Sequence, residues 1–201
     1  YGNGVFVATP SGPTTTAASS TDGITWTLRT LPSSNSWNSV TYGNSTFVTV
    51  AQNSTKAASS TDGITWTLRT MPSGNWYVTS YGNGIFVAAA YASTSAASST
   101  DGITWTLRTM PASSFWTSIT YGNGTFIAVS ATSSTTTAAS STDGITWTLR
   151  TMPAALTWTS AGYGFVNEVY QSIDTSTLSG VTSNIQTQLN TKASTSQTMY
   201  I

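Results

Sequence analysis

The stretch SSTDGITWTLRT occupies residues 19–30 and recurs, letter for letter, at 59–70, 98–109 and 140–151. The four aspartates of these copies are spaced 40, 39 and 42 residues apart. An enzyme needs its catalytic groups once, whereas a structural repeat needs its turns and packing residues in every copy. The repetition therefore indicates a tandem-repeat architecture.

A second marker, the tripeptide YGN, keeps the same spacing. It begins at Tyr1, Tyr42, Tyr81 and Tyr121, and a variant, YGF, begins at Tyr163. A period near 40 residues is typical of propeller blades and also of some helical repeats. The local pattern has to decide between these two classes.

The pattern inside each unit favours strands. Asn83-Gly84 and Asp62-Gly63 are hairpin signals, because Asn, Asp and Gly tolerate a positive φ. After Asp62-Gly63, apolar residues alternate with polar ones along ITWTLRT, which is the period of a strand with one buried face. Pro72 then ends the strand. Each unit is predicted to hold about four short antiparallel strands and no helix.

Four short strands in each 40 residues predict an all-β fold, a β-propeller of four-stranded antiparallel blades. Residues 1–164 form the predicted propeller of four or more blades, with units that begin near each YGN. The segment LTWTSAGYG at 156–164 resembles a further first strand. If the chain is a whole ring, we expect this closing strand to complete the first blade as a clasp. Blades upstream of Tyr1 are the alternative, since the chain does not begin with Met.

The repeated residues have predicted structural roles. We expect each aspartate to accept backbone N–H bonds within its turn, and each following glycine to allow the turn geometry. These turn residues are Asp22, Gly23, Asp62, Gly63, Asp101, Gly102, Asp143 and Gly144. The tryptophans predicted to be buried in the core are Trp26, Trp66, Trp105 and Trp147. The arginines expected to be solvated or to pair across strands are Arg29, Arg69, Arg108 and Arg150.

Two features are candidates for recognition. A second tryptophan series opens the units, and we expect it to pack in the ring or, as the alternative, to offer a glycan-facing surface. It consists of Trp37, Trp76, Trp116 and Trp158. Variable segments interrupt the copied unit, and loops that differ on a constant scaffold are where specificity usually lies. They are TPSGPTTT, AQNSTK, AAYASTS and SATSSTTT.

Composition excludes several classes of function. Only 6% of the 201 residues are charged, and six basic residues balance six acidic ones, so no basic field is available for nucleic acid. The absence of Cys and His removes thiol nucleophiles, the usual metal ligands and the usual proton shuttle. Glu168 is the only glutamate, so a carboxylate pair for glycoside hydrolysis is hard to assemble. We expect no catalytic, cofactor or metal site, and no membrane span.

Residues 165–201 have another character, because the repeat period is lost. Leu178, Val181, Ile185 and Leu189 recur at helical spacing, which predicts a short amphipathic helix weakened by Gly180, or otherwise an extended linker. Such a helix needs a partner. Docking on the propeller and a homo-oligomeric stalk, with a trimer favoured, both satisfy that need.

Two resemblances add to this interpretation. SSTDGITW resembles the Asp-box turn of sialidase-like propellers, with the departure that Asp22 and Gly23 are adjacent. That family implies a structural role for the turn, away from any active site. NIQTQLNTKAS at 184–194, followed by TMYI, and the tandem YGNG and STDGITWT units look like bacteriophage tail-fibre and other virion structural proteins.

The phage resemblance implies a non-catalytic adhesion or structural module, located in the virion as a tail fibre or appendage, that contacts host-surface glycans. A secreted or cell-surface bacterial propeller that binds carbohydrate or protein is the main alternative. A sialidase-like glycosidase is the weakest, because an enzyme would break the symmetry of its repeats with a unique set of catalytic residues.

Overall fold

The computed structural model describes residues 1–132 and 135–164, and residues 1–164 form one compact unit. The predicted tail helix, its oligomeric stalk and Glu168 lie outside the described residues. All regular secondary structure in the described part is β, which confirms the predicted all-β class.

The strands follow the repeat units in order. Unit 1 contains β1 (Phe6–Ala8), β2 (Thr14–Ser20) and β3 (Thr27–Asn35). Unit 2 contains β4 (Trp37–Gly43), β5 (Thr46–Ala51), β6 (Ser54–Ser60) and β7 (Thr67–Gly74). Units 3 and 4 contain β8 (Trp76–Gly82), β9 (Ile85–Ser99), β10 (Thr106–Gly122), β11 (Thr125–Ser130), β12 (Thr137–Ser141) and β13 (Thr148–Thr151).

Every strand pair is antiparallel, and the strands form three sheets in the orders β1-β2-β3, β4-β5-β6-β7 and β13-β12-β11-β10-β9-β8. The expectation of four short strands per unit holds in unit 2 alone. In units 3 and 4, β9 and β10 each cover two of the expected short strands. Ala92, with φ +56°, and a register shift at Ser114/Phe115 mark the points where two repeat strands join into one. Local irregularities bend the strands there without ending the ladder.

The apolar core consists of three clusters, each at a junction between neighbouring units. At the first junction, Leu31 of unit 1 packs with Phe47 and Trp66 of unit 2. Met71 and Met110 take the place of Leu31 at the next two junctions. Because each cluster draws side chains from two units, no unit buries its apolar surface alone.

Glycine and tyrosine of the Tyr-Gly pairs also join the units. A Cβ built on Gly43 would lie 2.0 Å from Cγ of Tyr81, and one on Gly82 would lie 2.1 Å from Cγ of Tyr121. The tyrosine of each pair thus covers the glycine of the preceding pair. Only glycine lets a ring approach the backbone so closely, which explains why the dipeptide is repeated.

Residues 156–164 lie beside unit 4. The backbone N–H of Trp158 donates to the carbonyl of Ser130, and the hydroxyl of Thr117 donates to the carbonyl of Trp158. Tyr163 covers Gly122 in the same way as the earlier pairs. The sheet of unit 1 has three strands, and 156–164 is not one of them. The clasp expected from this segment is therefore not seen among the described residues, because β1 pairs with β2 alone.

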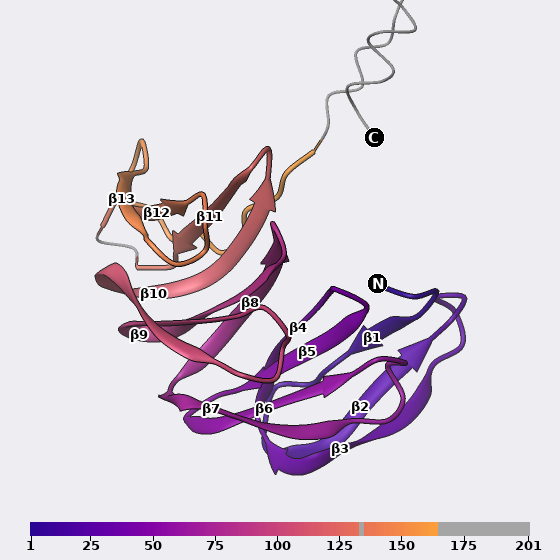
Figure 1. Cartoon of the computed structure of the whole chain (residues 1–201). Helices are drawn as coiled ribbons and strands as arrows, with labels where there is room; N and C mark the ends of the chain where they lie inside the picture. The colour runs from indigo at the N-terminus through magenta and orange to yellow at the C-terminus, as the bar shows by residue number, and fades with distance from the viewer. Residues whose placement is uncertain (133–134, 165–201) are drawn as a thin grey trace, which may run out of the picture. The chain divides into compact units, whose positions relative to one another are not determined.

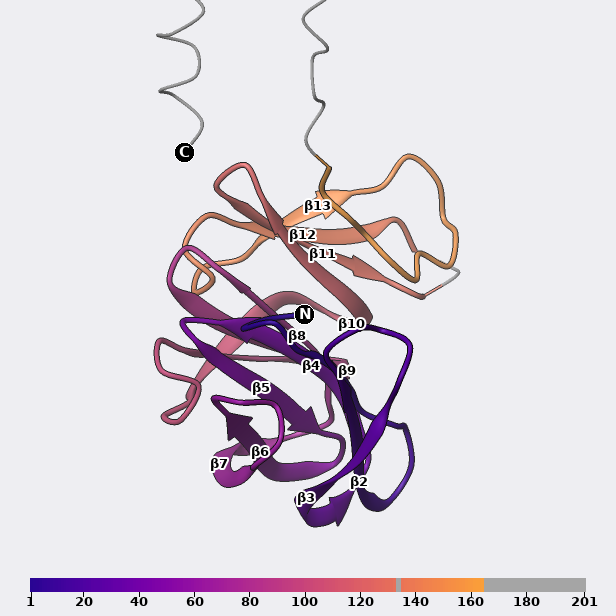
Figure 2. The same ribbon diagram turned by 90° about the vertical axis from the view of Figure 1, so that its right-hand side faces the viewer.

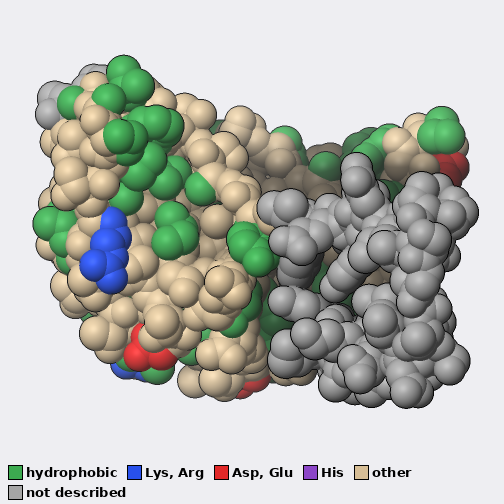
Figure 3. All heavy atoms as spheres, turned by 90° about the horizontal axis from the view of Figure 1, so that it is seen from above, with side chains coloured by type: hydrophobic (Ala, Val, Ile, Leu, Met, Phe, Trp, Pro, Cys, Tyr) green, Lys and Arg blue, Asp and Glu red, His purple; other side chains and the backbone are tan. Residues whose placement is uncertain are grey.

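The units follow one another in chain order in Figures 1 and 2. β2 and β3 lie at one end of the row, while β11, β12 and β13 lie at the other, and these two ends are apart in both views. The face shown in Figure 3 has only separate spots of basic and acidic side chains, in keeping with a composition that is 6% charged.

Candidate functional site

The first tryptophan series, which was expected in the core, is buried at three of its four positions. In the first series Trp66, Trp105 and Trp147 are 7%, 9% and 8% exposed, but Trp26, also expected in the core, is 45% exposed. Each of the three buried rings packs at a junction with the preceding unit. Trp26 has no such neighbour, although its surrounding twelve residues are identical. Burial of this series therefore depends on the preceding unit and not on the local sequence.

The second series offers no glycan platform at three of its four positions. Trp37, Trp76 and Trp116 are 0% exposed, and the first two donate their indole N–H to the carbonyls of Ser33 and Pro72. Their rings fill the junctions between units. The glycan-facing alternative for these three is wrong because no ring surface is accessible. The fourth, Trp158, is half-buried beside unit 4.

The aspartates hold their turns together by hydrogen bonds. Oδ1 of Asp62 accepts the backbone N–H groups of Ile64 and Thr65, both at 2.8 Å, and the hydroxyl of Ser60 at 2.8 Å. The same bonds recur at the other three turns. These bonds, led by the one from Thr65, lower the pKa of Asp62. A carboxylate with a lowered pKa is suited to structure and unsuited to general acid catalysis.

Each repeated arginine binds a serine on the neighbouring strand of its own unit. Nε of Arg69 donates to Oγ of Ser59 at 2.8 Å, and the other three arginines repeat this bond. The predicted cross-strand pairing thus has a hydroxyl as acceptor, where an acidic or backbone group was expected. Ser59 is 4% exposed, so the bond also satisfies a buried polar group.

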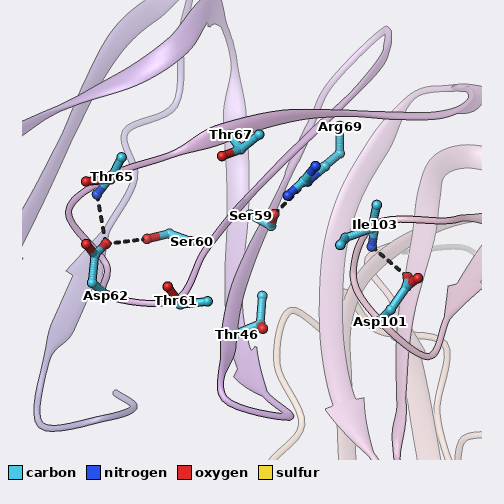
Figure 4. Close-up of a pocket in the computed structure, with 10 residues that line it drawn as sticks. All are labelled: Thr46, Ser59, Ser60, Thr61, Asp62, Thr65, Thr67, Arg69, Asp101 and Ile103. Atoms are coloured by element: carbon cyan, nitrogen blue, oxygen red, sulfur yellow. Dashed lines mark hydrogen bonds between the residues drawn. The ribbon is translucent and has the colours of Figure 1, made fainter.

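A polar pocket of about 220 Å³ lies where the turns of units 2 and 3 meet (Figure 4). Its lining is Thr46, Ser59, Ser60, Thr61, Asp62, Thr65, Thr67, Arg69, Asp101 and Ile103. Hydroxyls, two carboxylates and a guanidinium can hydrogen-bond a polyol. The bonds drawn in Figure 4 already commit Asp62 and Asp101 to backbone N–H groups. The pocket can bind a polar ligand but holds no nucleophile with a base beside it.

An aromatic cluster lies on the opposite edge of the molecule. The rings of Tyr91 and Phe115 are stacked, with centroids 4.6 Å apart and planes 8° apart, and Tyr77 lies 5.1 Å from Tyr91. Phe115 is 37% exposed, and both tyrosines are half-buried. Because strands in a unit alternate in direction, this edge carries the variable segments, while the other edge carries the YGN hairpins and the aspartate turns. We call Tyr77, Tyr91 and Phe115 the aromatic cluster.

Polar groups surround the aromatic cluster. The side-chain amide of Asn75 donates to the carbonyl of Tyr91 at 3.3 Å, and the backbone N–H of Phe115 donates to the hydroxyl of Thr132 at 3.3 Å. Ser114 exchanges a hydrogen bond with Thr132 at 3.3 Å. Asn75 and Ser114 hold the backbone and side chains around the cluster, while the exposed ring of Phe115 and the half-buried hydroxyl of Thr132 are left to meet a ligand.

Sequence reasoning placed specificity in the variable segments, and Tyr91 lies in one of them, AAYASTS. It missed the cluster itself. The signal in the sequence was that two repeat positions are aromatic in one unit and polar in another. Phe115 corresponds to Ser36 of unit 2, and Tyr91 corresponds to Gln52 of unit 2. The three rings are far apart in the sequence, and only strand pairing brings them together.

Residues 1–132 and 135–164 contain neither a cluster of metal ligands nor a helix that could span a membrane. No three Cys, His, Asp or Glu side chains in these ranges group into a metal site. No helix among these residues is long and apolar enough to cross a membrane.

Comparison with known proteins shows the fold. A scan of protein-family models and a search of curated proteins both returned no match. Solved structures of β-propeller proteins are similar to this chain, among them YCF48 bound to a D1 peptide, with 19% identity and a TM-score of 0.56 over 76% of this chain and 52% of that one. The fold is propeller-like.

Two other similar structures are a lyase and a designed protein. A catalytically inactive virginiamycin B lyase from Staphylococcus aureus, with quinupristin, has 16% identity and a TM-score of 0.61 over 70% of this chain and 50% of that one. The computationally designed Ika8 protein has 10% identity and a TM-score of 0.53 over 75% and 50%. At such identities the likeness concerns the fold alone. The chain spans about half the length of these solved structures.

Proposed function

We propose that this chain is a non-catalytic structural and adhesion module of a virion, a tail-fibre or appendage propeller that binds host-surface glycans through the aromatic cluster. The virion assignment rests on the resemblance of residues 184–194 and of the tandem units to phage fibre proteins. The observation that carries the glycan assignment is the exposed stack of Tyr91 and Phe115 within an otherwise copied scaffold.

The geometry of the aromatic cluster suits a sugar ring. The C–H face of a pyranose packs on the face of an aromatic ring, and its hydroxyls need donors and acceptors at the rim. Phe115 provides the exposed ring, with Tyr91 behind it as a rigid support. Thr132, which is half-buried, provides a hydroxyl at its rim, and the buried Ser114 hydrogen-bonds that hydroxyl. Stacked rings lose little conformational entropy on binding, which favours recognition by few contacts.

A non-catalytic role agrees with the chemistry of the chain. The lyase described above is catalytically inactive as a histidine-to-alanine variant, and this chain contains no histidine. The repeated aspartates are equivalent to one another and are engaged in turn bonds. A unique acid and base at one mouth of the fold would be needed for hydrolysis.

The second candidate is a secreted or cell-surface bacterial propeller that binds protein. One observation favours it, because a propeller-like neighbour was solved with a bound peptide. The aromatic cluster would then anchor an apolar side chain of the partner, as aromatic residues do at protein interfaces.

A glycan array with the full chain tests the proposal. We expect binding to a glycan class, and a loss of about fivefold or more in affinity for Phe115→Ala, since one aromatic contact is worth about 1 kcal/mol. Ser36→Ala, at the position of unit 2 that corresponds to Phe115, is the matched control and should bind as the parent does. Equal binding by Phe115→Ala and the parent, or a bound peptide in place of any glycan, would refute the glycan assignment.

A further inference from the structure

One hairpin position departs from the repeat at the polar pocket of Figure 4. The YGN hairpins of units 1 and 3 carry the aliphatic residues Val5 and Ile85 two positions after the asparagine. The equivalent residue of unit 2 is Thr46, which lines the pocket. A hydroxyl thus replaces an aliphatic side chain where the turns of units 2 and 3 meet.

The aliphatic side chain fills the space beside the next aspartate turn, and the threonine does not. A Cβ built on Gly144 would lie 3.0 Å from Cγ2 of Ile85. At the equivalent Gly102, the three nearest atoms extend to 3.8 Å and none of them belongs to Thr46. The hydroxyl of Thr46 donates to the carbonyl of Asn44 at 3.2 Å, within its own hairpin. This bond holds the side chain back from the turn and leaves the pocket open.

The charged groups of the pocket keep hydrogen-bonding capacity. The turn bonds of Asp62 and Asp101 all end on Oδ1, so Oδ2 of each carboxylate remains an acceptor. Nε of Arg69 donates to Ser59, and a guanidinium has further N–H donors. Figure 4 shows the two aspartates on opposite sides of the pocket, with Thr46 and Ser59 between them. Acceptors and donors therefore face the same space.

Charge and size select the class of ligand. Two carboxylates and one guanidinium give the lining a net negative charge, which disfavours an anion such as a sialic acid. Among the described residues no three acidic, Cys or His side chains group into a metal site, and Ca²⁺ prefers about six to eight oxygen ligands. A neutral polyol suits both kinds of group, because each hydroxyl can donate to a carboxylate and accept from a guanidinium. The volume of about 220 Å³ lies below the roughly 300–1,000 Å³ of pockets for drug-sized ligands, which favours a single sugar residue.

We propose that this pocket binds one neutral sugar residue, with the sugar hydroxyls on Asp62, Asp101 and Arg69. Ile103, which is 45% exposed and lines the same pocket, offers an apolar contact to the C–H groups of the ring. The site lies on the edge opposite the aromatic cluster, so the inference does not depend on the glycan-binding role proposed for that cluster. A single residue held by hydrogen bonds on a partly open surface binds weakly, with a dissociation constant on the order of millimolar.

Amide NMR of the isotope-labelled full chain, titrated with methyl α-D-mannopyranoside, tests the inference. We expect the backbone amides of both turns, at residues 64–65 and 103–104, to shift with a millimolar dissociation constant. Thr46→Ile copies the residue of unit 3 into the pocket and should weaken binding by about tenfold or more. Thr125→Ile, at the equivalent position of unit 4 and outside the pocket lining, is the matched control and should bind as the parent does. No shift at tens of millimolar sugar, or equal binding by Thr46→Ile, would overturn the proposal.

A second variant changes the chemistry and keeps the turn. In Asp101→Asn the amide oxygen can accept the same backbone N–H bonds, but the second carboxylate oxygen is lost. We expect a loss of about fivefold or more in affinity, whereas Asp22→Asn, at the equivalent turn of unit 1, should have no effect. Equal affinity for Asp101→Asn and the parent would contradict the assigned contact.

Three further probes and one variant define the ligand and the site. Glycerol, N-acetylneuraminate and Ca²⁺ should each shift the turn amides less than the mannoside does at equal concentration. A larger shift with any of them would refute the assignment to a neutral sugar residue. Phe115→Ala should leave the shifts at residues 64–65 and 103–104 unchanged. Their loss in this variant would show that they arise from the aromatic cluster and would overturn the pocket as a separate site.

Discussion

Replacement of Gly82 by alanine should destabilise the chain, and the size of the effect should depend on the aromatic ring of Tyr121. A Cβ at this position would lie 2.1 Å from Cγ of Tyr121, which is 0.9 Å inside the 3.0 Å below which such contacts are essentially never found. The nearest atoms belong to an aromatic ring packed on the backbone, and not to the tip of a flexible chain. The ring has to move.

Two responses bracket the magnitude. If Tyr121 stays, overpacking costs about 1–3 kcal/mol. If it leaves, the loss is the burial of the ring, about 1.5–3 kcal/mol, together with its contact with Phe126 at a centroid distance of 4.6 Å. Alanine also restricts the unfolded chain more than glycine does, which returns about 0.5–1 kcal/mol. We therefore expect Gly82→Ala to lower the free energy of unfolding by about 1–2 kcal/mol.

A double-mutant cycle followed by urea unfolding and tryptophan fluorescence isolates the cause. In a Tyr121→Ala background the added methyl meets no ring, so Gly82→Ala should be neutral or slightly stabilising, with a coupling energy of about 2–3 kcal/mol. Gly162→Ala, with no atom within 4 Å of the added Cβ, is the control and should change stability by less than about 0.5 kcal/mol. Additive effects of Gly82→Ala and Tyr121→Ala would refute the role assigned to the Tyr-Gly pairs.

Two further predictions concern the repeated twelve residues. Trp66→Ala should lower the free energy of unfolding by about 3–5 kcal/mol, because its ring is only 7% exposed. Trp26→Ala should lower it by less than half of that where the chain is monomeric, because Trp26 is 45% exposed. Equal losses would contradict the conclusion that the preceding unit buries this series. The pKa of Asp22 is lowered from 3.8 to about 2, first by the backbone N–H of Thr25. A lowered folded pKa gives stability that is fully present above pH 3.8 and is lost as the pH falls toward 2. The free energy of unfolding, measured from pH 6 to 2, should thus decline, and the decline should be shallower when all four turn aspartates are replaced by asparagine. Parallel curves for the parent and the variant would argue against a contribution from these carboxylates.

The polar pocket and the aromatic cluster differ in how far the sequence predicted them. The turn chemistry behind the pocket is local, because an aspartate bonds the N–H groups two and three residues ahead. The pattern STDG was therefore sufficient to predict it. The stack of Tyr91 on Phe115 depends on the pairing of β9 with β10, which single residues in separate units do not reveal.

The sequence by itself determined the repeat, the strands and the turns, since each depends on neighbours within a few residues. The tertiary structure alone decided which aromatic rings are buried. Trp26 and Trp66 have identical flanking residues, but Trp26 is 45% exposed and Trp66 is 7% exposed. For the tryptophans that open units 2 to 4, the sequence left packing and a glycan-facing surface both open, and the structure buries all three rings completely. The reason is physical: a hydrogen-bonded turn forms from its own residues, but an apolar surface is buried only when a separate unit packs against it.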